Sequence, residues 1–100
     1  MAQITTHILN ALDGTHASSV EVKLSVHGTE IFSGMTDEGG RLKFCIDISI
    51  YESTDEFSLS FGIGRLFNAK SQNKFGVRIN YSTLSFQMPE KDGQYHIPVI

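Results

Sequence analysis

The chain has 100 residues, of which 40% are hydrophobic and 19% are charged, and its formal net charge at pH 7 is −3. A second domain would need roughly 50 further residues, so we expect one domain over residues 1–100. The excess of acidic residues argues against binding to nucleic acids or anionic membranes, because both bind protein surfaces rich in Lys and Arg. No apolar run approaches the ~20 residues of a membrane span, and the first residues lack the pattern of a secretion signal. We therefore expect a cytoplasmic protein with no nucleic-acid or membrane partner.

Cysteine and histidine usage predicts no cofactor and no metal site. Cys45 is the single cysteine, so the chain cannot form an internal disulfide or a cysteine-based zinc site. The four histidines are His7, His16, His27 and His96, and they show no metal-ligand spacing. Because His16 and His27 flank turns, we expect both of them to be solvated.

Apolar and polar residues alternate along most of the chain, which is typical of strands with one buried face. The first alternations cover residues 4–10 and 20–26, and a turn at His27-Gly28 leads into residues 30–33. A second turn spans residues 37–40. There we expect the adjacent glycines, Gly39 and Gly40, to supply the positive φ angles of a tight turn.

The second half of the chain continues the same pattern. Further alternations cover residues 42–48, 57–63, 77–81, 84–88 and 94–100. The apolar parity changes between residues 77–81 and 84–88, which predicts a β-bulge or a bend near Ser82-Thr83. Residues 65–71 are the one place where a short helix fits. Short strands separated by turn signals every ~8–12 residues predict an all-β antiparallel sandwich or barrel.

The last predicted strand has an open edge, whose backbone hydrogen-bonding groups need a partner. Residues 94–100 end within an apolar alternation, and Pro98 cannot donate a hydrogen bond to a neighbouring strand. Open strand edges are normally protected. We expect a partner subunit, or further chain, to cover this one.

Three side chains could carry chemistry, although each has an ordinary explanation when taken alone. His7 lies on the strand face opposite Ile4 and could be purely structural. Arg41 directly follows the glycine turn and is either a surface charge or a guanidinium aimed at an anionic substrate or an oxyanion. His96 lies on the face opposite Tyr95, and the same two readings apply to it as to His7.

The remaining candidates are weaker. Cys45 alternates out of phase with its apolar neighbours and faces Lys43 and Asp47. No neighbouring histidine or helix N-terminus is evident that would activate its thiol, so we do not expect a nucleophile there. Residues 62–64 lack the third glycine and the following helix of a nucleotide-binding loop.

Three segments of the chain are similar to three known sequence motifs, and they occur in the same order as those motifs. Residues 4–10, Ile-Thr-Thr-His-Ile-Leu-Asn, are similar to a Thr-His-Val-Leu-Asp strand, and residues 36–41, Thr-Asp-Glu-Gly-Gly-Arg, to a Thr-Asn-x-Asp-Gly-Arg turn. Residues 95–100, Tyr-His-Ile-Pro-Val-Ile, are close to Tyr-His-Val-Pro-Leu-Leu. Together they resemble the 5-hydroxyisourate hydrolases, the purine-catabolic members of the transthyretin-like family.

This resemblance implies a transthyretin-like antiparallel β-sandwich with a short helix after the fifth strand. It implies a homotetramer built from dimers, with the active sites in a channel between them. His7, Arg41 and His96 match the family's catalytic positions. The implied reaction is hydrolysis of 5-hydroxyisourate, with no cofactor: water attacks the ring carbonyl, a histidine acts as general base and the arginine stabilises the anion. The family also has a further C-terminal strand with a Tyr-Arg-Gly-Ser signature, which residues 1–100 do not contain.

Two other functions stay open alongside the hydrolase. One is a catalytically inactive transthyretin-like module that binds a small ligand or a protein in the inter-subunit channel. The other is a structural sandwich with no site, for which we expect apolar side chains to plug the channel. The presence of His7, Arg41 and His96 favours the hydrolase, since a binding module has no need of all three. Either histidine could be the base.

Overall fold

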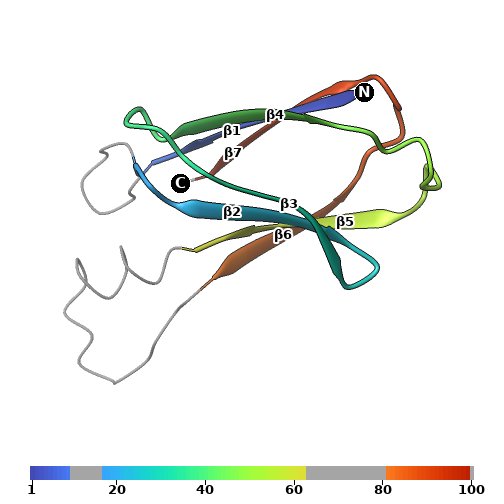
Figure 1. The fold of residues 1–100 in the computed structure, drawn as a ribbon, viewed down its shortest axis with the longest axis horizontal. Helices are drawn as coiled ribbons and strands as arrows, with labels where there is room; N and C mark the ends of the chain where they lie inside the picture. The colour runs from blue at the N-terminus through green and yellow to red at the C-terminus, as the bar shows by residue number, and fades with distance from the viewer. Residues whose placement is uncertain (10–16, 63–80, 100) are drawn as a thin grey trace.

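A computed structural model describes residues 1–9, 17–62 and 81–99, which form two β-sheets stacked face to face (Figure 1). The three-stranded sheet has the order β4-β1-β7, and the four-stranded sheet has the order β3-β2-β5-β6. The strands are β1 (Ala2–Ile8), β2 (Glu21–Val26), β3 (Thr29–Met35), β4 (Arg41–Ile46), β5 (Glu56–Phe61), β6 (Ser82–Gln87) and β7 (Gln94–Val99). The predicted all-β sandwich is therefore confirmed.

One strand pair departs from the antiparallel arrangement that we expected. β1 and β7 run parallel, whereas β1 and β4 are antiparallel. Parallel neighbours need a long connection, and here that connection is the whole chain between the two strands. Within the described residues β7 pairs only with β1, so its other edge carries no strand.

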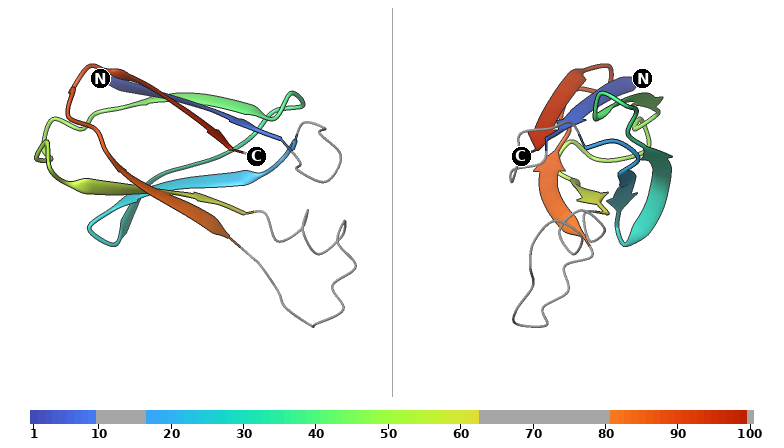
Figure 2. Two further views of the ribbon diagram at one scale, coloured as in Figure 1. Left: turned by 180° about the vertical axis from the view of Figure 1, so that it is seen from behind. Right: turned by 90° about the vertical axis from the view of Figure 1, so that its left-hand side faces the viewer.

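Figure 2 shows the two sheets as separate layers. The core lies between them and is formed by side chains from both sheets. Phe57 and Phe61 of β5 are fully buried, as are Leu24 of β2 and Ile4 of β1. Burying one such side chain contributes about 1.5–3 kcal/mol. The alternation along each strand thus sets which face is apolar, and it leaves the intervening residues of β1 on the outer face.

The hairpin between β2 and β3 forms at the predicted turn. His27 and Gly28 both have positive φ, at 52° and 74°, as a two-residue hairpin loop of type I′ requires. A bulge follows in this pair: Leu24 lies opposite Phe32 and Ser25 opposite Glu30, so Ile31 has no partner residue.

No bulge interrupts the pairing of β6 at Ser82-Thr83, and the alternative of a bend stays a prediction because residues 77–80 lie outside the described residues. β6 pairs with β5 in unbroken register from Ser82 to Gln87. Leu84 and Phe86 lie opposite Leu59 and Phe57, but β6 is a sheet edge, so Leu84 remains 40% exposed. The predicted helix at residues 65–71 and most of the predicted strand at 77–81 lie outside the described residues. Of the residues described, none belongs to a helix that could cross a membrane.

Thr36 ties the end of β3 to the segment before β2. Its side chain is buried, donates a hydrogen bond to the Ala17 carbonyl at 2.7 Å and accepts one from the Val20 amide at 2.9 Å. Buried polar groups are costly unless they are paired, so this hydroxyl satisfies two backbone groups at once.

We expect Thr36→Val to lower the free energy of unfolding by about 1–3 kcal/mol, because two buried backbone groups lose their partner. Thr36→Ser keeps the hydroxyl and should lose less. Urea unfolding followed by circular dichroism measures both. A Thr36→Val variant as stable as the wild type, or a larger loss in Thr36→Ser than in Thr36→Val, would contradict the role assigned to the hydroxyl.

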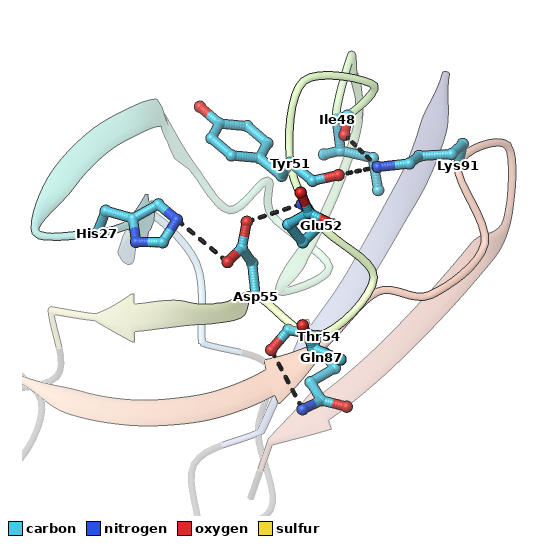
Figure 3. Close-up of polar contacts among 8 residues, drawn as sticks. All are labelled: His27, Ile48, Tyr51, Glu52, Thr54, Asp55, Gln87 and Lys91. Carbon is cyan, nitrogen blue, oxygen red and sulfur yellow. Dashed lines mark hydrogen bonds and ion pairs between the residues drawn. The ribbon is translucent and has the colours of Figure 1, made fainter.

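A network of polar contacts holds the loop between β4 and β5, at the end of the sandwich away from the β3–β4 turn (Figures 1 and 3). Lys91 Nζ donates to the Ile48 carbonyl at 3.1 Å and to the Tyr51 carbonyl. Asp55 accepts from the Glu52 amide at 2.8 Å, and its second oxygen lies 3.3 Å from His27 Nε2. The Glu52 amide and then His27 hold the pKa of Asp55 below its ordinary value.

This shift predicts acid sensitivity. A carboxyl whose pKa is lower in the folded state adds stability that is present above its ordinary pKa of 3.8 and is lost as pH falls through the lower folded value. Between pH 5 and pH 2 the urea midpoint of the wild type should therefore fall more steeply than that of Asp55→Asn. Glu38→Gln, which removes an exposed carboxylate elsewhere, is the control. Parallel curves for wild type and Asp55→Asn would contradict the assignment.

Candidate active site

Rows of side chains cross the outer face of the β4-β1-β7 sheet. Ile4, Thr6 and Ile8 of β1 are buried, so the residues between them lie on the opposite face. His7 lies directly across from Arg41 of β4, and opposed side chains in such a pair begin about 5 Å apart. The next row contains three members, Lys43, Thr5 and His96, one from each strand.

These two rows line a pocket of about 370 Å³. Its volume lies within the range of small-molecule sites, about 300–1,000 Å³. The lining residues are Thr5, Thr6, His7, Asp37, Arg41, Leu42, Lys43 and His96. The pocket thus brings together His7, Arg41 and His96, which lie far apart in the sequence.

The turn before Arg41 is held together by the side chain of Asp37, a residue of the turn itself. Oδ1 of Asp37 accepts hydrogen bonds from the amides of Gly39 and Arg41, both at 2.9 Å. Gly40 has a φ of 72°, which favours glycine, whereas Gly39 does not adopt a positive φ as we had expected. The Gly40 carbonyl accepts from the Ile8 amide at 2.8 Å, so the turn docks on the end of β1 beside His7.

The pocket is locally cationic although the chain is acidic overall. Arg41 and Lys43 face a single carboxylate, Asp37, one oxygen of which already holds the turn. Among the residues that the structure describes, neither cation forms an ion pair. Both are exposed, so they are accessible to an anionic ligand.

The two histidines differ in their surroundings. His7 is half-buried, whereas His96 is exposed, and Nδ1 of His96 lies 2.8 Å from the Thr5 hydroxyl. No group of three His, Cys, Asp or Glu side chains able to hold a metal ion occurs in the described part of the chain. The arrangement offers two imidazoles, a guanidinium and an ammonium around one open pocket.

The other candidates lie elsewhere. Cys45 is exposed on the outer face, as expected, but it pairs with Gln3 and does not line the pocket. His27 is 63% exposed at the far end of the sandwich, and His16 lies outside the described residues. The residues that sequence reasoning missed are Thr5 and Lys43, which strand parity with His7 and Arg41 could have indicated.

Comparison with known proteins gives the chain a family. A sequence profile described as the HIUase/Transthyretin family matches residues 4–100. The chain belongs to this family. Its members include both hydrolases and transthyretins, so membership alone leaves the activity to be established by the site. No curated protein sequence matches the chain.

Solved structures share the fold at low sequence identity. Klebsiella pneumoniae 5-hydroxyisourate hydrolase superposes with a TM-score of 0.73 at 23% identity, covering 98% of this chain and 88% of the hydrolase. An (S)-allantoin synthase gives 0.72 at 20% identity, over 99% of this chain and 40% of the synthase. Sea bream transthyretin in complex with thyroxine gives 0.66 at 22% identity, over 85% of this chain and 73% of the transthyretin.

The turn should depend on the oxygen of Asp37 and not on its charge. Asp37→Ala leaves the Gly39 and Arg41 amides without their acceptor, and we expect a loss of about 1 kcal/mol and faster hydrogen exchange at both amides. Asp37→Asn keeps an oxygen in place and should exchange as slowly as the wild type. If Asn and Ala were equally disruptive, the charge of the carboxylate would be the stabilising feature instead.

Proposed function

We propose that this protein hydrolyses 5-hydroxyisourate, a cyclic amide of purine catabolism, at the pocket on the β4-β1-β7 sheet. The observation that carries the proposal is the convergence of His7, Arg41 and His96 on that pocket. These are the positions that match the catalytic residues of the family's hydrolases. The family match over residues 4–100 supports the same function.

The chemistry follows from the side chains present. A neutral imidazole takes a proton from water as the water oxygen attacks the ring carbonyl, which contributes roughly 10²- to 10⁴-fold to the rate. Negative charge then develops on the carbonyl oxygen, and the guanidinium of Arg41 stabilises it. When the carbonyl re-forms, the ring C–N bond breaks, the imidazolium returns its proton to the leaving nitrogen and the new end of the open ring is a carboxylate.

The local charge suits this substrate class. Arg41 can hold an anionic ring or the developing oxyanion with paired hydrogen bonds, and Lys43 adds a second positive charge. A cytoplasmic location and a homotetramer built from dimers are part of the proposal. Partner subunits over the outer face would narrow the open pocket into a channel that excludes bulk water and keeps room for the attacking water molecule.

The decisive assay follows the ultraviolet absorbance of freshly prepared 5-hydroxyisourate. The protein should accelerate its decay, and His7→Ala should lower kcat by about 10²- to 10⁴-fold. Arg41→Gln, which loses the charge that stabilises the oxyanion, should lower kcat by about 10²- to 10³-fold. His27→Ala removes a histidine at the other end of the sandwich and should keep the wild-type rate.

A second function, small-molecule binding without catalysis, is favoured by the thyroxine-bound transthyretin of the same fold. The assay separates the two functions. Decay that is the same with and without the intact protein would rule out the hydrolase, and saturable binding of urate by that inactive protein would establish the binding module.

A further inference from the structure

Thr5 occupies the middle of its row, with Lys43 of β4 on one side and His96 of β7 on the other. Its Oγ1 lies 2.8 Å from Nδ1 of His96, which is the distance of a hydrogen bond. All three residues line the pocket. Through this hydroxyl the central strand contacts the ring of His96.

The direction of this hydrogen bond decides what His96 offers a ligand. A neutral imidazole carries one N–H and one bare nitrogen, and a hydroxyl can donate to the bare nitrogen or accept from the N–H. If Thr5 donates to Nδ1, the ring proton is on Nε2. If Thr5 accepts, the proton is on Nδ1 and Nε2 is the bare, basic nitrogen.

Lys43 lies opposite Thr5 in the register of β1 and β4 and lines the same pocket, and a positive charge on this side favours donation by Thr5. An ammonium group has three donors and no acceptor, so its charge favours hydroxyl orientations that turn the oxygen lone pairs toward it and the proton away from it. On the other side of Thr5 in the row lies Nδ1 of His96, toward which the hydroxyl proton can then point.

We propose that Thr5 is a positioning residue: its hydroxyl donates to Nδ1 of His96 and holds the ring as the Nε2–H tautomer. His96 then presents a hydrogen-bond donor to the pocket, and His7 is the general base. Arg41 and the His96 Nε2–H together stabilise the oxyanion, as neutral histidines do in other oxyanion sites. The tautomer is a property of the free protein, and only its catalytic consequence rests on the proposed function.

Nitrogen-15 NMR of the labelled protein, with two-bond proton–nitrogen correlations of the histidine rings, reports the tautomer directly. We expect one Nε2–H form for His96 in the wild type and in Thr5→Ser, and a mixture of both forms in Thr5→Val. The matched control is Thr83→Val, an exposed strand threonine on β6 whose hydroxyl lies 3.1 Å from Ser60 Oγ. An Nδ1–H form in the wild type, or a His96 spectrum unchanged by Thr5→Val, would overturn the inference.

Kinetics give a second readout. Loss of one such hydrogen bond should lower kcat about tenfold in Thr5→Val with little change in KM, and Thr5→Ser should restore it. A rise in KM alone would assign Thr5 to substrate binding and overturn the positioning role. An inactive wild type would refute the proposed function while leaving the NMR result intact, so the two failures are distinguishable.

Discussion

The register of β1 between its two neighbours is the constraint on which the site depends. Ile4 and Ile8 are buried in the core, and the buried Thr6 hydroxyl donates to the Ile97 carbonyl of β7 at 2.5 Å. A slip of one residue would turn these side chains outward and bring His7 into the core. The fold would then lose the burial of apolar side chains and would also have to bury a polar imidazole. The packing that stabilises the sandwich therefore also fixes which side chains share a row on its outer face.

Stability and chemistry are divided between different parts of the molecule. The inner faces of both sheets carry the core, and the β4–β5 loop is held by Lys91 and Asp55 at the end away from the pocket. At the pocket end, the amides of the β3–β4 turn bond to one carboxylate oxygen, so the turn forms without any bond from the guanidinium of Arg41. The two cationic groups there form no ion pair among the described residues, which is the arrangement that the proposed binding of an anion needs.

Sequence alternation predicted the strands and their faces well, because period two is a local property. It placed His7 opposite Ile4 and found the His27-Gly28 turn. It did not reveal that β7 runs parallel to β1, or that the bulge falls at Ile31, because pairing joins segments distant in sequence and leaves no local pattern. The resemblance named three site residues. Strand parity places Thr5 on the face of His7 and Lys43 on the face of Arg41, but only the strand pairing shows that both share a row with His96.

The central claim is that these rows form a binding site for an anionic product of purine oxidation. A crystal structure with bound urate, an unreactive relative of the substrate, tests it most directly. The account predicts urate in the pocket, within hydrogen-bond distance of the Arg41 guanidinium and of Nε2 of His96. Urate bound elsewhere, with Arg41 and His96 in contact only with solvent, would contradict it.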